Sequence, residues 1–154
     1  MKMLGATAVL VGLLVAALVA AGQLGWLAGQ RPTDLGVRDG RLKPPPKTPN
    51  GISSQATDEA RRVEPLRYTG DGAAAFARLR DLVAGWPGAS IVVKSPGYLH
   101  AEVTTRWLRF VDDLEFLLDP AAGVIQVRSA SRLGHSDLGT NRRRVEAIRR
   151  RFGG

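Results

Sequence analysis

The sequence predicts an α+β domain, a two-layer sandwich of helices on an antiparallel sheet, preceded by one N-terminal transmembrane helix. Residues 3–22 lack charged side chains, and residues 90–132 alternate apolar and polar side chains between turn residues. Segments 71–86 and 138–152 flank that region and carry apolar residues at helical spacing. With a short strand at 62–68 they give the order β-α-β-β-β-β-α, in which helices pack on an antiparallel meander.

The N-terminal apolar segment runs from Met3 to Gly22 and has apolar residues on every helical face. A helix of that length is about 30 Å long, which matches the hydrocarbon core of a bilayer. We expect residues 1–30 to form an uncleaved, single-pass membrane anchor with Trp26 at the interface. The alternative is a cleaved signal peptide, although the apolar run exceeds the usual length of about 7–15 residues.

Composition limits the chemistry of the remaining chain. The protein has 154 residues, no cysteine and a net charge of +8. The length beyond the anchor suffices for one core, and the lack of cysteine excludes disulfides, thiol catalysis and Cys-ligated metals. The positive charge attracts anionic lipid or nucleic acid. Nucleic acid is the weaker option, because few aromatic residues are interleaved with the basic ones.

Residues 31–50 are predicted to be a Pro-rich linker, and residues 51–154 are predicted to be the globular domain. The linker contains the run Pro44-Pro45-Pro46, which favours an extended spacer. Basic residues follow the apolar segment and would place the domain in the cytoplasm by the positive-inside rule, yet long domains are also translocated. Composition therefore leaves the orientation open.

The elements of the domain each have a local signal. Pro65 makes the first strand an edge strand, and Asp71 and Gly85 are the expected start and stop of the first domain helix. Four strands then alternate in the ranges 90–94, 99–107, 110–118 and 124–132. The last helix is expected at 138–152, with Ser136 or Asp137 as its cap and an apolar stripe of Leu138, Val145, Ile148 and Phe152.

One predicted polar cluster faces the helices. Strand alternation places Asp112, Ser129 and Ser131 on the apolar face of the sheet, and Asn141 lies on the inward stripe of the last helix. Unpaired polar groups are costly in such a position. We therefore predict a network in which Asp112, Ser131, Asn141 and one arginine pin the last helix to the sheet.

A second predicted cluster lies on the other face, where Asp113 and Glu115 should oppose Arg106, Arg128 and Arg132. Paired carboxylates can do acid–base work or bind a hard cation. The interpretation we favour is a ladder of arginine–carboxylate pairs across neighbouring strands.

Catalysis has weaker support. Segment 129–137 contains Ser, His and Asp, but consecutive residues rarely converge into a triad, and no G-x-S-x-G motif is present. The alternative function is a hydrolase-like or metal-assisted enzyme using Asp112, Asp113, Glu115 and His135.

The arginines of the last helix form either a solvated face or a contact for lipid headgroups; they are Arg142, Arg143, Arg144, Arg149, Arg150 and Arg151.

The chain resembles the bacterial and plastid family called domain of unknown function 1499. The strings that carry the resemblance lie at 35–42, 49–55, 65–68, 110–116, 127–132 and 136–146. The family name implies no activity, and many members carry N-terminal membrane segments. Members typically have cysteines where this chain has Pro45 and Gly51, so the joint loss looks like the loss of a disulfide and implies an exported domain. Members more often have an aromatic residue in place of His135, which weakens a general-base role.

Together these observations predict a non-enzymatic binding or structural module at the cell envelope, anchored in the membrane with its domain on the extracytoplasmic side. The expected partners are the membrane, through the N-terminal helix, and an anionic lipid or envelope protein. No cofactor or metal is expected. The candidate site residues are Asp112, Asp113, Glu115, Arg128, Ser129, Ser131, Arg132, Asp137, Asn141 and Arg144.

Overall fold

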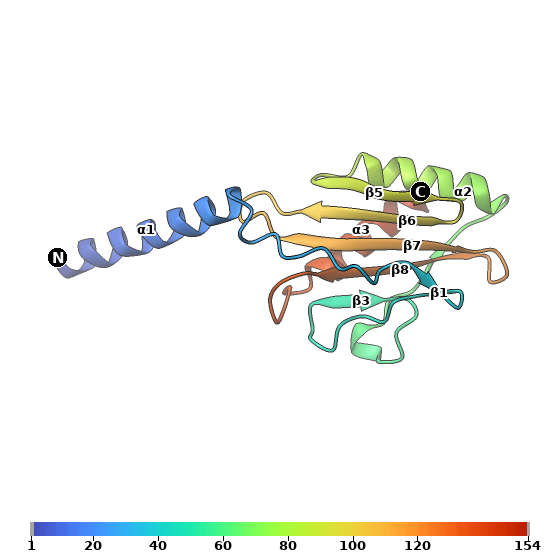
Figure 1. Cartoon of the computed structure of the whole chain (residues 1–154), viewed down its shortest axis with the longest axis horizontal. Helices are drawn as coiled ribbons and strands as arrows, with labels where there is room; N and C mark the ends of the chain where they lie inside the picture. The colour runs from blue at the N-terminus through green and yellow to red at the C-terminus, as the bar shows by residue number, and fades with distance from the viewer. Residues whose placement is uncertain (1, 154) are drawn as a thin grey trace.

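The computed structural model describes residues 2–153 (Figure 1). The helices are α1 (Lys2–Gln23), α2 (Gly72–Ala84) and α3 (Thr140–Phe152), with a short 3-10 helix η1 (Glu59–Arg61). The strands are β1 (Val37–Arg38), β2 (Arg41–Leu42), β3 (Gly51–Ser53), β4 (Leu66–Arg67), β5 (Ala89–Ser95), β6 (Tyr98–Thr104), β7 (Val111–Asp119) and β8 (Val124–Ser131).

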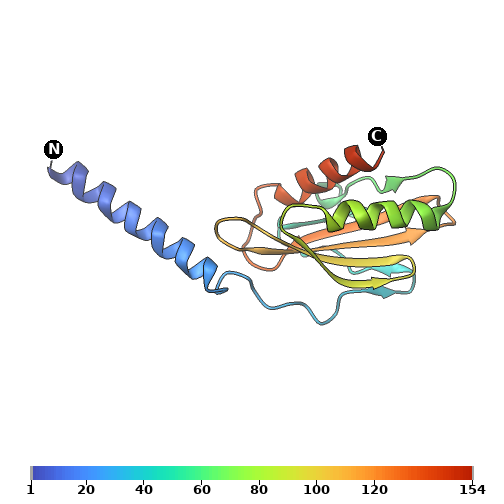
Figure 2. The same ribbon diagram turned by 90° about the horizontal axis from the view of Figure 1, so that it is seen from above.

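The main sheet is antiparallel, as predicted, and has the order β3-β8-β7-β6-β5, with β4 also pairing with β8. Helices α2 and α3 lie on one face of this sheet (Figure 2). Alternation along the strands directs Leu99, Phe116 and Ile125 toward those helices, where they are fully buried against Leu79 and Ile148. Each such side chain contributes about 1.5–3 kcal/mol through burial, so this layer is the hydrophobic core.

The opposite face of the sheet is crossed by the segment that leads from α1 to β2 (Figure 2). The backbone N–H of Gly36 donates to Glu115 Oε1 at 3.0 Å, and Arg31 donates to Glu102 at 2.5 Å. Leu42 is buried, and its N–H donates to Gln55 Oε1 at 2.9 Å. Part of the segment predicted to be a linker thus lies against the sheet and shields its polar face.

The predictions of a transmembrane helix and of a single-pass membrane location are corrected by the structure. Within residues 2–153, no helix is both long and apolar enough to cross a bilayer. Helix α1 comprises Lys2–Gln23. The helix ends against the β6–β7 loop, where Gln23 donates to the Trp107 carbonyl at 3.2 Å.

The last helix begins later than its apolar periodicity predicted. Helix α3 starts after Gly139, which has a φ of 78°, and Leu138 is 84% exposed and does not join the apolar stripe. The carboxylate of Asp137 accepts from the N–H groups of Gly139 and Asn141, at 2.9 and 2.7 Å, and turns the chain ahead of the helix.

Strand ends also differ from the prediction. The edge strand predicted at 62–68 is only the pair Leu66–Arg67, and β6 ends at Thr104, so Trp107 lies in a loop. Strand β3 was not predicted, because three residues are too few to show alternation.

Candidate functional site

The predicted polar network is present between β7, β8 and α3. Arg144 Nη2 donates to Asp112 Oδ2 at 2.5 Å, and Arg144 Nη1 donates to Asn141 Oδ1 at 2.8 Å. Asn141 Nδ2 donates to Ser131 Oγ at 3.0 Å, and the Ser129 hydroxyl donates to the Asn141 amide oxygen. Arg144 is therefore the arginine of this network; Asn141 connects both serines to it, and Arg144 Nη1 also donates to Ser129 Oγ at 3.3 Å.

The same asparagine reaches beyond the sheet. Asn141 Nδ2 also lies 2.8 Å from Asp137 Oδ2 and 3.2 Å from the Asn50 carbonyl oxygen. Asn50 Nδ2 in turn donates to the Gly134 carbonyl at 2.6 Å. These bonds join the start of α3, the β8–α3 loop and the residue before β3, so the network holds the helix in place.

The arginine–carboxylate ladder occupies the other face of the sheet. Arg128 Nη1 donates to Glu115 Oε2 at 3.0 Å, and Arg132 donates to Asp113 through Nε at 2.9 Å and Nη2 at 2.7 Å. His100 Nε2 also lies 2.9 Å from Asp113 Oδ1. Arg106 does not belong to this ladder, because it lies in the β6–β7 loop with its guanidinium over the Trp107 ring.

Two carboxylates next to the ladder arginines have lowered pKa values. Burial opposes ionisation of Asp113, but hydrogen bonds from Arg132 and His100 outweigh it and hold the pKa of Asp113 below its ordinary value. The pKa of Glu102 is also lowered, since hydrogen bonds from Arg31 and Arg132 outweigh its desolvation. A general base works best with a pKa near the operating pH, so these two carboxylates are suited to be counterions.

The structure separates the candidate site residues into two groups. Asp112, Ser129, Ser131, Asp137, Asn141 and Arg144 lie on the helix side, whereas Asp113, Glu115, Arg128 and Arg132 lie on the opposite side. Asp112 and Asp113 are neighbours in one strand and point to opposite faces. His135 is exposed, and no hydrogen bond or ion pair between described residues joins it to these carboxylates. The proposed acid–base group is therefore not assembled. In the described chain, no group of three or more His, Asp or Glu side chains is placed to hold a metal.

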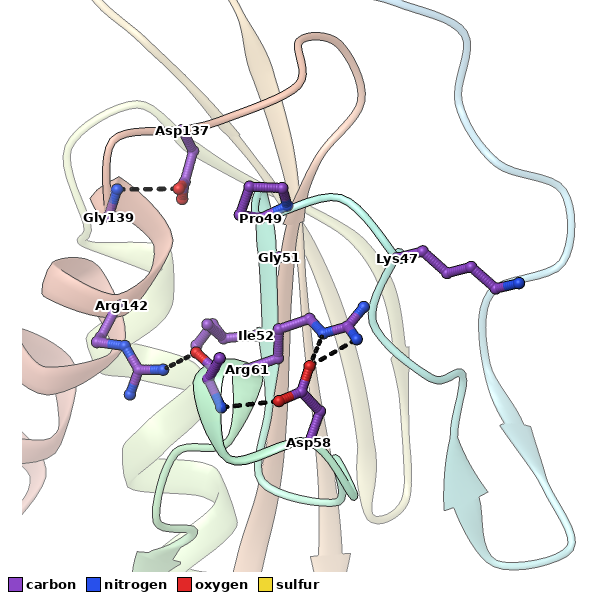
Figure 3. Close-up of a pocket in the computed structure, with 10 residues that line it drawn as sticks. Lys47, Pro49, Gly51, Ile52, Asp58, Arg61, Asp137, Gly139 and Arg142 are labelled. Carbon is purple, nitrogen blue, oxygen red and sulfur yellow. Dashed lines mark hydrogen bonds and ion pairs between the residues drawn. The ribbon is translucent and has the colours of Figure 1, made fainter.

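A small cavity of about 230 Å³ lies between η1, β3 and the start of α3 (Figure 3). Its arginines are already used: Arg142 donates to two backbone carbonyls in and after η1, at 2.8 Å each, and Arg61 pairs with Asp58 at 2.6 Å. Asp137 turns toward Gly139, and Lys47 points away from the cavity (Figure 3). These contacts tie η1 to α3 and leave few groups for a ligand.

A larger cavity of about 590 Å³ lies between the α2–β5 loop and the β6–β7 loop. We call it the arginine cleft; its lining includes Trp86, Gly88, Thr105, Arg106, Arg109 and Arg144.

The cationic groups of the arginine cleft are largely uncommitted. Arg106 and Arg109 are exposed, and no carboxylate among the described residues pairs with them. Arg109 holds a φ of 57°, which is uncommon for a non-glycine residue. The Thr105 hydroxyl is buried without a hydrogen-bond partner. Arg151 stacks on the Trp86 ring, with its guanidinium carbon 4.6 Å from the ring centre.

Most of the cleft was missed by the sequence reasoning, which included only Arg144 among the site residues. Strand alternation was extended through Trp107, and this hid the turn that carries Arg106 and Arg109. The available signal was the string Arg106-Trp107-Leu108-Arg109, two cations without a nearby acid in sequence before Asp112.

The comparison with curated proteins found no match, and the comparison with solved structures found none either. The model of one family, described as protein of unknown function (DUF1499), matches residues 41–152. That range includes both polar clusters and the arginine cleft, and it confirms the resemblance seen in the sequence. With most of its length covered by this match, the chain belongs to the DUF1499 family.

Proposed function

We propose that this protein is a non-enzymatic binding module whose arginine cleft binds a small phosphate ester with an apolar or aromatic body. The observation that carries the proposal is the lining of that cleft. Arg106, Arg109 and Arg144 line one cavity together with Thr105, and no carboxylate lines it.

The lining groups match the chemistry of phosphate. Guanidinium groups bind phosphate oxygens through two parallel N–H bonds, and such charge-assisted bonds are stronger than neutral ones. Asp112 bonds to Arg144 and neutralises its charge, so Arg106 and Arg109 supply the net positive charge of the cleft.

The apolar part of the lining favours an organic ester over the bare ion. Trp86, Pro87 and Val103 also line the cleft, and Trp86 presents an aromatic ring beside the cations. Aromatic side chains bury large areas, and ring pairs add about 0.5–1.5 kcal/mol. A phenyl or similar group attached to the phosphate can therefore lie against Trp86.

A binding role is favoured over catalysis by the position of the carboxylates. Asp112 is bound to Arg144, and Asp113 is bound to Arg132 on the other face of the sheet. Neither is placed to abstract a proton in the cleft, since a general base must reach its proton within about 2.6–3.2 Å.

The test is calorimetric titration of the full-length protein with phenyl phosphate, with inorganic phosphate and phenol as comparisons. Arg106→Gln and Arg109→Gln should each weaken phenyl phosphate binding about tenfold or more, because each removes a charge-assisted contact. Arg67→Gln is the matched control, since Arg67 is exposed in β4 and does not line the cleft. Binding should also weaken between 50 and 200 mM salt, by roughly the screening expected for exposed charges.

Three results would overturn the proposal. Equal affinity in the wild type, Arg106→Gln and Arg109→Gln would place the ligand elsewhere. Release of phenol during the titration, abolished by the same substitutions, would show that the cleft is catalytic. Phenol binding as tightly as phenyl phosphate would show that the phosphate group does not contribute to the affinity.

A further inference from the structure

A second cavity lies at the other end of α2 from the arginine cleft, between that helix and the turns of the sheet. It is an open groove of about 650 Å³. Ala73, Phe76 and Ala77 line it from the helix, and Leu99 and Leu118 line it from the facing side of the sheet. We call it the apolar groove.

The groove is a consequence of residue size on α2. Phe76 and Leu79 fill the core beneath the helix, but Ala73 and Ala77 are too small to cover the ends of β6 and β7. The wall formed by the strand turns is held in place, because the Leu118 N–H donates to the Gly97 carbonyl at 2.8 Å. The space is therefore preformed, as small-molecule sites usually are.

The rim of the groove is cationic. Arg80 and Lys94 line it, and no acidic side chain does. Arg80 is engaged with Asp81 at 2.7 Å, whereas Lys94 is exposed and its ammonium group has no hydrogen bond or ion pair to any other described residue. An apolar channel beside one available ammonium group is complementary to a molecule with an aliphatic chain and a carboxylate end.

We propose that the apolar groove binds a straight-chain aliphatic carboxylate, with its chain over Leu99 and Leu118 and its carboxylate on Lys94. This site is independent of the arginine cleft, which lies beyond the C-terminal end of α2, whereas Ala73 is in the first turn. Two features select this ligand: methylene groups lose contact with water in the groove, and Lys94 offers a point charge to the carboxylate.

The test is titration of the full-length protein with hexanoate, octanoate and decanoate, at concentrations where these carboxylates do not form micelles. Affinity should rise by up to about fourfold for each added methylene group. Ala77→Leu should fill the groove and weaken decanoate binding at least tenfold while leaving the melting temperature close to that of the wild type, since leucine is nearly as good a helix former as alanine. Lys94→Gln should reduce decanoate affinity to that of decanol, and Lys94→Arg should largely restore it.

Arg67→Gln is again the charge control, and Arg106→Gln separates the two sites. Decanoate affinity should be the same in both variants as in the wild type. Affinity independent of chain length would overturn the proposal. So would unaltered decanoate binding in folded Ala77→Leu, or equal binding of decanoate and decanol by the wild type. Loss of decanoate binding in Arg106→Gln would place the chain in the arginine cleft and would equally overturn it.

Discussion

Arg144 of α3 and Asp112 of β7 form an ion pair across the helix–sheet interface, with 2.5 Å between Nη2 and Oδ2. Their side chains are only 7% and 3% exposed. Charges so well removed from water are tolerated because each has a partner and further hydrogen bonds. Arg144 also donates to Asn141, so the pair and the amide act as one unit. The same guanidinium lines the arginine cleft, which makes this pair the link between the core and the proposed site.

Asp112→Asn should destabilise the protein by about 3–5 kcal/mol, because it leaves the buried Arg144 without its counter-charge. Asn141→Ala should cost about 1–3 kcal/mol, since Ser131 loses its donor and Ser129 loses its acceptor. Chemical denaturation of each variant measures both values. Unchanged or increased midpoints in both would contradict a structural role and would assign these side chains to ligand binding.

Asp113 should make stability depend on acid pH. Its pKa is lowered in the folded state, so the unfolded chain binds more protons as the pH falls. The stabilisation is fully present above the ordinary aspartate pKa of about 4 and is lost as the pH falls through the folded value. The difference in unfolding free energy between wild type and Asp113→Asn should therefore be constant from pH 7 to about 5 and should shrink below about 4. A difference that stayed constant down to pH 3 would contradict this assignment.

Phe116→Ala should lower the free energy of unfolding by about 3–5 kcal/mol, because it opens a cavity in the centre of the core. Phe116 is completely buried and pairs in register with Leu99 and Val127. Leu117→Ala is the control one residue away, on the other face of β7, where the side chain is half-buried and the cost should be clearly smaller. If the two variants melted alike, the strand register would be shifted by one residue.

Gly51→Ala should destabilise the protein by roughly 1–3 kcal/mol through overpacking. A Cβ at Gly51 would lie 2.6 Å from Pro46 Cδ and 2.8 Å from Ala130 Cβ, so β3 would have to move away from β8. Gly85→Ala is the matched control, because the nearest atom to its Cβ is 3.7 Å away and its φ of −84° suits alanine. Thermal melts of both variants measure the difference, and a neutral Gly51→Ala would show that the β3 edge can shift freely.

Much of the sheet and of its polar clusters follows from the sequence. Period-2 alternation assigned Asp112, Ser129 and Ser131 to the helix side, because side-chain direction in a strand depends only on parity. The cost of burying a polar group then required partners, and Asn141 and an arginine were the groups within reach. The same reasoning predicted that Asp113 and Glu115 face arginines of the neighbouring strands, and the structure pairs them with Arg132 and Arg128.

The alternation of side chains along a strand does not determine where the strand ends or which segment covers the other face of the sheet. Arg106 was expected in the ladder, but β6 stops at Thr104 and the loop carries this arginine to the arginine cleft instead. The segment around Gly36 was expected to be part of a linker, and the Gly36 N–H donates to Glu115 and helps to shield that carboxylate. Both outcomes depend on contacts between residues far apart in the chain, which no local pattern reports.

The sequence by itself therefore determined the family, the strand faces and the members of the buried polar network, since each depends on local composition or on side-chain parity. Only the tertiary structure decided that the segment around Gly36 bonds to Glu115, and that the α2–β5 and β6–β7 loops meet around a cavity rich in arginine. The physical reason is that a cleft forms between separate elements, so its shape depends on how two loops and a helix pack. The distances between these elements are set by the packing of the whole core.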